Sequence, residues 1–146
     1  PNVDHASWAY RGPTFFCYGP GLQGLLPSAA DAVVHQHGLW QYMSIACADL
    51  QKWRGCRRVV SPHGMLHPWA LRVRPYRKRA AWAAYERRSS AEADVFHATA
   101  AAEADYIRDR GLRQCRCLEW SQREQWAGHG FGQSHQCVQY QWCWCG

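Results

Sequence analysis

Two His-Gly dipeptides are the residues of this sequence whose type and placement are best suited to chemistry. His37-Gly38 and His63-Gly64 each follow a short β-rich run and precede a helical or loop segment. An imidazole gives or takes a proton near neutral pH, and glycine lets the backbone approach a ligand closely or adopt a positive φ. Parallel strands place such turns at one edge of a sheet, where ligands bind. We expect the two histidines to line one site, with a purely structural role for each as the alternative.

A third turn offers a helix end. Thr99 follows the β-rich run at residues 94–98 and precedes helical spacing at residues 100–110, so we expect it to cap that helix. The first amides of a helix form a positive end that can hold an anionic oxygen. Glu103 lies one residue too far from Thr99 for a capping box, but the helix dipole favours its carboxylate in the first turn. Capping without a ligand is the alternative for this turn.

Strands that alternate with helices must position these turns. The β-rich runs are residues 32–35, 58–61 and 94–98, and helical spacing covers residues 39–53, 76–93 and 100–110. This alternation predicts βαβ units, and therefore an α/β fold with a Rossmann-like parallel sheet and flanking helices. The fold is expected to be partial, because the opening strand and Gly-rich turn of a complete doubly wound domain are absent.

The remaining segments are expected to be less regular. Residues 65–75 are predicted to form a loop, and residues 14–18 and 22–30 a strand and a short helix. One face of the helix at residues 76–93 follows the three-and-four spacing of a buried stripe. Its members are Ala81, Trp82, Tyr85 and Ser89.

Basic residues are concentrated in one stretch. The chain carries a net charge of +6, and residues 72–88 hold seven basic side chains against Glu86 alone. Such a stretch can meet phosphates or an anionic membrane surface, or it can be a solvated helix face. The residues that would face a membrane are Arg72, Arg74, Arg77, Lys78 and Arg79.

The sequence changes character after residue 114. Five of the eight cysteines fall in residues 115–146, which are rich in Trp and Gln and show neither strand nor helix periodicity. We therefore divide the chain into an α/β part at residues 1–114 and an irregular, unassigned part at residues 115–146. One alternative function is metal binding, although C-x-C pairs are poor zinc spacings. Its ligands would be Cys115, Cys117, His129, His135, Cys137, Cys143 and Cys145.

Two further properties limit the class of protein. No stretch approaches the roughly 20 apolar residues of a membrane-spanning helix. The chain starts at Pro1 without a signal-peptide pattern, and we expect it to be a piece of a longer protein. A small basic nucleic-acid binder is a second alternative, but the aromatic residues are not interleaved with the arginines as a stacking surface requires. We therefore expect no nucleic-acid partner.

Three stretches together resemble a known family. They are DAVVHQHGLWQYMS, VVSPHGMLHPWAL and ADVFHATAAAEADYIRDRGL, with a basic helix between the last two. Over residues 15–114 they are similar to the acceptor-side, N-terminal half of a bacterial family 4 glycosyltransferase with the GT-B fold. The resemblance implies a retaining transferase that moves a sugar from a nucleotide-sugar donor to a glycan or lipid-linked acceptor during polysaccharide synthesis, in the cytoplasm or at the inner face of the membrane. It implies no metal and no cofactor besides the donor, which is a substrate.

The resemblance also implies roles for individual residues. His63 matches the cleft histidine that contacts the donor sugar and its phosphate, and we take it as the catalytic candidate. Ala100 departs from the serine usual in the third-turn motif. The residues implied to bind substrate are His37, Gly38, Trp40, Gly64, Met65, Thr99 and Glu103.

Parts of the family pattern are missing. After Gly111-Leu112 neither the apolar strand nor the Pro-Asn-Gly turn that leads to the nucleotide-binding domain is present, and residues 115–146 lack a pair of glutamates eight positions apart. We therefore expect three strands of one half-enzyme, inactive alone, followed by a segment read out of frame after a frameshift. The flanking nucleotide sequence tests the frameshift.

Overall fold

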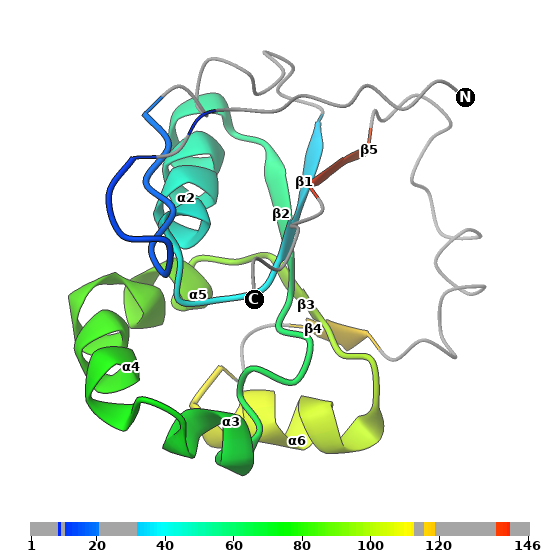
Figure 1. The fold of residues 1–146 in the computed structure, drawn as a ribbon. Helices are drawn as coiled ribbons and strands as arrows, with labels where there is room; N and C mark the ends of the chain where they lie inside the picture. The colour runs from blue at the N-terminus through cyan, green and yellow to red at the C-terminus, as the bar shows by residue number, and fades with distance from the viewer. Residues whose placement is uncertain (1–8, 10, 21–31, 113–115, 119–136, 141–146) are drawn as a thin grey trace.

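Strands and helices alternate along the part of the chain that the structure describes. The structure is a computed structural model and describes residues 9, 11–20, 32–112, 116–118 and 137–140 (Figure 1). In chain order the elements are β1 (Val33–His37), α2 (Tyr42–Arg54), β2 (Arg57–Ser61), α3 (Pro68–Arg72), α4 (Pro75–Ala81), the π-helix η1 (Trp82–Glu86), α5 (Arg87–Ala91), β3 (Val95–His97), α6 (Ala101–Asp109), β4 (Arg116–Leu118) and β5 (Cys137–Tyr140).

The strands form one parallel sheet in the order β4-β3-β2-β1-β5. Val33 of β1 lies opposite Arg57 of β2, and Val59 of β2 lies opposite Val95 of β3. The predicted α/β fold with a parallel sheet is therefore confirmed, and β1 and β2 are neighbours as expected. Besides the three expected strands, the sheet includes β4 and β5, which form its two edges.

One face of the sheet carries the core. Val34, Val60 and Phe96, on β1, β2 and β3, are at most 1% exposed and point to the same side. Val34 packs against α2, while Val60 and Phe96 pack with Ala104 and Ile107 of α6. Figure 1 shows α2 and α5 on the same side of β1 and β2. Because side chains alternate along a strand, His35, His37, Ser61 and His97 lie on the opposite face.

Helix α2 begins three residues later than predicted. It starts at Tyr42 rather than Leu39, because Trp40 adopts a positive φ of 71°, which a right-handed helix does not allow. The helix ends at Gly55, whose φ of 70° and N–H bond to Gln51 O form a left-handed cap. Strand β1 in turn extends to His37, so that this histidine is the last strand residue and not a turn residue.

The segment from residue 68 to residue 91 is more helical than predicted. The expected loop at residues 65–75 contains α3, whose first amides are capped by the His67 side chain, which accepts from Trp69 N–H. From Pro75 the helices α4, η1 and α5 follow one another directly. The predicted inward face is confirmed, since Trp82 and Tyr85 are partly buried and Ser89 is 5% exposed.

A buried arginine ties the core face together. The Arg58 guanidinium donates to Gln51 Oε1 at 2.9 Å and to Gln36 Oε1 and Ser89 Oγ at 3.0 Å. It also donates to the Ser89 carbonyl oxygen. Arg58 is 0% exposed, and this burial lowers its pKa. These bonds join β1, α2, β2 and α5.

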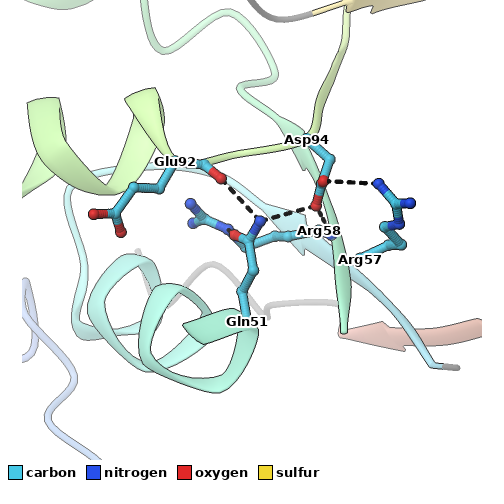
Figure 2. A network of polar contacts seen from close by, with 5 residues as sticks. All are labelled: Gln51, Arg57, Arg58, Glu92 and Asp94. Carbon is cyan, nitrogen blue, oxygen red and sulfur yellow. Dashed lines mark hydrogen bonds and ion pairs between the residues drawn. The ribbon is translucent and has the colours of Figure 1, made fainter. Parts of the chain in front are cut away.

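The neighbouring Asp94 holds the start of β3 beside β2. Figure 2 shows its carboxylate between two arginines: Oδ2 accepts the Arg58 backbone N–H at 2.8 Å, and Oδ1 pairs with the exposed Arg57 guanidinium at 3.3 Å. Gln51 donates to both Asp94 Oδ2 and Glu92 O. The carboxylate therefore anchors the residue that precedes β3 to the start of β2, where the Asp94 N–H also donates to Arg58 O at 3.2 Å.

The structure differs from the prediction for the N-terminal residues that it describes. Residues 14–18 are not a strand: residues 14–16 form a turn, and Arg11 makes an isolated antiparallel bridge with Tyr18. Phe16 of this turn packs edge-on against Tyr42 and Tyr85. The predicted helix at residues 22–30 lies outside the described residues.

Candidate active site

The two predicted histidines meet at the carboxyl edge of the sheet. His37 Nδ1 and His63 Nε2 lie 2.7 Å apart, which is hydrogen-bond distance, and the two rings stack with an interplanar angle of 6°. His37 is the last residue of β1, and His63 follows β2 by two residues. The expectation that they share one location is confirmed. Their roles toward a substrate stay predictions.

Two further histidines lie beside this pair, and both contact one serine. Ser61 Oγ, 0% exposed, lies 2.7 Å from His35 Nε2 and 3.0 Å from His97 Nδ1. The His35 ring lies 4.2 Å from that of His37, centroid to centroid. The sequence reasoning missed these three residues because it considered turns only. Strand periodicity was the available signal, since His35 and His37 share a face of β1 and the register places Ser61 beside His37.

The environment favours the neutral form of the His37 ring. Burial lowers the pKa of His37, and the neighbouring imidazoles of His63 and His97 lower it further. A hydrogen bond between two imidazoles needs one ring to donate and the other to accept. Because His37 Nε2 is buried, His63 Nδ1 is the nitrogen of the pair that is left to exchange a proton with a hydroxyl group.

The His63-Gly64 turn is held in a left-handed conformation. The φ values are 50° at His63 and 74° at Gly64, and the first is costly for a residue with a side chain. Gly64 N–H donates to Glu103 Oε1 at 2.6 Å, which anchors the turn to α6. The turn thereby directs the His63 ring toward His37.

Glu103 links the second turn to the third. Its Oε2 accepts the backbone N–H and the hydroxyl of Thr99, both at 2.7 Å, while Oε1 accepts from Gly64. The prediction that Thr99 caps α6 is wrong: Ala100 occupies the cap position, and the Thr99 hydroxyl donates to Glu103. Glu103 is only 5% exposed and accepts three bonds, so it positions the two turns.

The turn after β1 is closely packed. A Cβ on Gly38, whose φ is 84°, would lie 3.1 Å from Met65 Cε, and Leu39 N–H points to Met65 Sδ at 3.1 Å. Trp40 N–H donates to Glu86 Oε2 at 2.7 Å, and the Trp40 ring packs beside that of Trp82. Met65 and Trp40 thus support the turn. Among the predicted binding residues Gly64 and Thr99 are exposed, but the backbone N–H groups of both donate to Glu103.

Metal binding by the C-terminal cysteines gains no support. Cys117 lies in β4 and Cys137 in β5, at opposite edges of the sheet, on the order of 19 Å apart at the usual strand spacing. The other proposed ligands lie outside the described residues. Within the described ranges, no three His, Cys, Asp or Glu side chains are grouped to hold a metal ion.

Among the helices that the structure describes, none is long and apolar enough to cross a bilayer.

Comparisons with known proteins point to one family. The family description "Glycosyl transferase 4-like domain" matches residues 3–118, which include every element from β1 to β4. Neither the curated proteins nor the solved structures yielded a match. The nucleic-acid and metal-binding alternatives are not favoured by this match.

Proposed function

The chain belongs to the glycosyltransferase 4-like domain family, and on that premise we propose that it forms the acceptor-side half of a retaining glycosyltransferase. The donor would be a nucleotide sugar and the acceptor a glycan or a lipid-linked sugar. The observation that carries the proposal is the hydrogen-bonded pair of His37 and His63 at the carboxyl edge of the parallel sheet. This edge is where α/β sheets bind ligands.

The pair has the properties that sugar transfer needs. Transfer requires a positioned hydroxyl group and stabilisation of the departing phosphate. His63 is exposed and held by a fixed turn, so we assign it the contact with the donor sugar and its phosphate. His37, whose Nε2 is buried, acts toward the acceptor hydroxyl through its hydrogen bond with His63. Gly64 leaves open space beside His63, whereas the Met65 side chain fills the space beside Gly38.

Turnover would require a nucleotide-binding half on the other side of the cleft, because catalysis depends on contacts to both reacting partners. We therefore expect the 146-residue chain to bind ligands without transferring sugar. Donor turnover by this chain, lost in His63→Ala, would overturn that expectation.

Binding is tested on the isotope-labelled chain by NMR, with UDP-glucose, GDP-mannose and farnesyl diphosphate as probes. At least one probe is expected to shift the ring signals of His37 and His63, and His63→Ala should abolish the response. His67→Ala is the matched control, because His67 is exposed on the same loop and packs on Tyr106 away from the pair. The proposal is wrong if no probe shifts the pair, or if His63→Ala binds like the wild type.

A membrane surface is the partner that the structure of α3 and α4 favours. Trp69, Val73 and Tyr76 are 70%, 44% and 81% exposed, and no acidic residue occurs between residues 62 and 81. Exposed aromatic side chains among basic ones are typical of segments that lie in the interface of an anionic bilayer. Among the ion pairs of the described residues, none involves the five basic side chains of this surface, which are Arg72, Arg74, Arg77, Lys78 and Arg79.

We therefore propose that α3 and α4 rest on the inner face of the cytoplasmic membrane, close to a lipid-linked acceptor. Sedimentation with vesicles that contain phosphatidylglycerol should recover the protein, whereas pure phosphatidylcholine should not. The double variant Arg72→Ala/Arg79→Ala should bind about 30-fold more weakly. Trp69→Ala should also weaken binding, but Trp53→Ala should not, although Trp53 is 67% exposed between Lys52 and Arg54 on α2. Equal effects of the two tryptophan variants would contradict this surface.

A further inference from the structure

Glu86 is a buried carboxyl group beside the candidate site that the sequence reasoning did not assign. Its side chain comes from η1, is 0% exposed and reaches the turn after β1, where Oε2 accepts the Trp40 N–H at 2.7 Å. Trp40 is three residues after His37 and adopts a left-handed φ of 71°. An accepted N–H bond at such a residue stabilises a conformation that the backbone alone disfavours.

The π-helix delivers two contacts to the same residue. Trp82, the first residue of η1, places its ring 6.1 Å from that of Trp40, and Glu86, the last residue of η1, binds its amide. Single π turns inside α-helices are rare and frequently occur at functional sites. Here the π turn fixes the backbone and the ring of Trp40 from one element.

The groups around the Glu86 carboxyl do not fully offset the cost of burying its charged form. Burial raises the pKa of Glu86 to about 7, against the opposing effects of the Trp40 amide, the Ser44 hydroxyl on α2 and the Arg58 guanidinium on β2. On its own element, Tyr85 is the neighbouring titratable group. Both protonation states of Glu86 are therefore accessible near neutral pH.

We propose that Glu86 is a positioning residue for the candidate site, and that its ionised form holds Trp40, and through it the turn that follows His37, in place. A carboxylate accepts an amide N–H more strongly than a protonated carboxyl does. Gain of a proton thus loosens the turn that follows His37. The importance of this turn for sugar transfer rests on the proposed function, whereas the control of Trp40 by Glu86 does not.

The test follows the Trp40 backbone amide by NMR across the pH range around neutrality. In the wild type the chemical shift of this amide should change in a single step, with a midpoint near the pKa of Glu86. Glu86→Gln keeps an oxygen acceptor and cannot ionise, so the Trp40 signal should stay constant. Glu86→Ala should raise hydrogen exchange at Trp40 by about tenfold or more and shift the His37 ring signal.

Glu92→Gln is the matched control, because Glu92 follows α5, is exposed and pairs only with Arg88 among the ion pairs of the described residues. It should leave the Trp40 titration unchanged. A Trp40 titration that persists in Glu86→Gln would assign the step to the histidines and overturn the proposal, as would unchanged exchange in Glu86→Ala. If the Trp40 titration behaves as expected while no sugar nucleotide or diphosphate binds, the positioning role stands and the transferase assignment fails.

Discussion

Replacement of Arg58 tests the claim that a buried guanidinium holds the sheet to its helices. Arg58→Ala removes side-chain bonds to Gln36, Gln51 and Ser89 and leaves a cavity at a position that is 0% exposed. Gln36 and Ser89 are themselves 1% and 5% exposed, so their acceptor atoms would lose the arginine without gaining water. Arg57, the preceding residue, has a side chain that is 72% exposed and makes one ion pair with Asp94.

The expected magnitude follows from these differences. Each buried acceptor left unpaired costs about 1–3 kcal/mol, and relief of the buried charge offsets part of this. We expect Arg58→Ala to lower the free energy of unfolding by about 3 kcal/mol and Arg57→Ala by less than about 0.5 kcal/mol. Arg58→Met keeps the aliphatic stem and should cost about 2 kcal/mol, because the polar partners remain unpaired.

Urea unfolding followed by tryptophan fluorescence and far-UV circular dichroism measures these values. Arg58→Met serves as the second variant if Arg58→Ala does not fold. The reasoning is refuted if Arg58→Ala lies within about 1 kcal/mol of Arg57→Ala, or if Arg58→Met is as stable as the wild type.

Three further predictions concern the site and its supports. Gly38→Ala should lower the free energy of unfolding by about 1–2 kcal/mol more than Gly55→Ala does, measured by thermal or urea unfolding. Both glycines have a positive φ, but of the two only Gly38 has a neighbour within 3.4 Å of the new methyl group. Equal losses of stability would contradict the close packing. Burial raises the pKa of Glu86 to about 7, so between about pH 4.5 and 7 the folded state binds a proton that the unfolded state has lost. The free energy of unfolding should therefore fall as pH rises through that window, by at most about 3 kcal/mol. The same pH dependence in a Glu86→Gln protein would contradict this explanation. His63→Ala should raise the pKa of His37, measured by NMR of its ring, because the neighbouring imidazole is one cause of its lowering; an unchanged or lower value would show that His63 has no such influence.

The meeting of His37 and His63 could be predicted because two simple rules apply to it. Neighbouring β-rich runs joined by a helix form parallel strands, and the ends of parallel strands share one edge of the sheet. The same reasoning missed His35 and Ser61 because it placed the end of the first strand two residues too early and did not apply the two-residue alternation to the strand residues.

Two other differences have separate causes, one local and one long-range. The Thr99 cap fails because Glu103 accepts both Thr99 donors from within the helix, which shifts the helix start to Ala101. Strands β4 and β5 have little apolar patterning, and their pairing depends on backbone hydrogen bonds to strands far away in sequence. The pairing of these two strands is therefore not visible in a short window of residues.

The pairing of β1 with β5 has a consequence for synthesis of the protein on the ribosome. Val33 lies opposite Cys137, so these partners are separated by about 100 residues, and the edge of β1 stays unpaired until the later strand has left the exit tunnel. During that interval β1 presents open amide and carbonyl groups to other nascent chains. A chaperone that shields extended segments should therefore improve the yield more than a lower growth temperature that only slows translation.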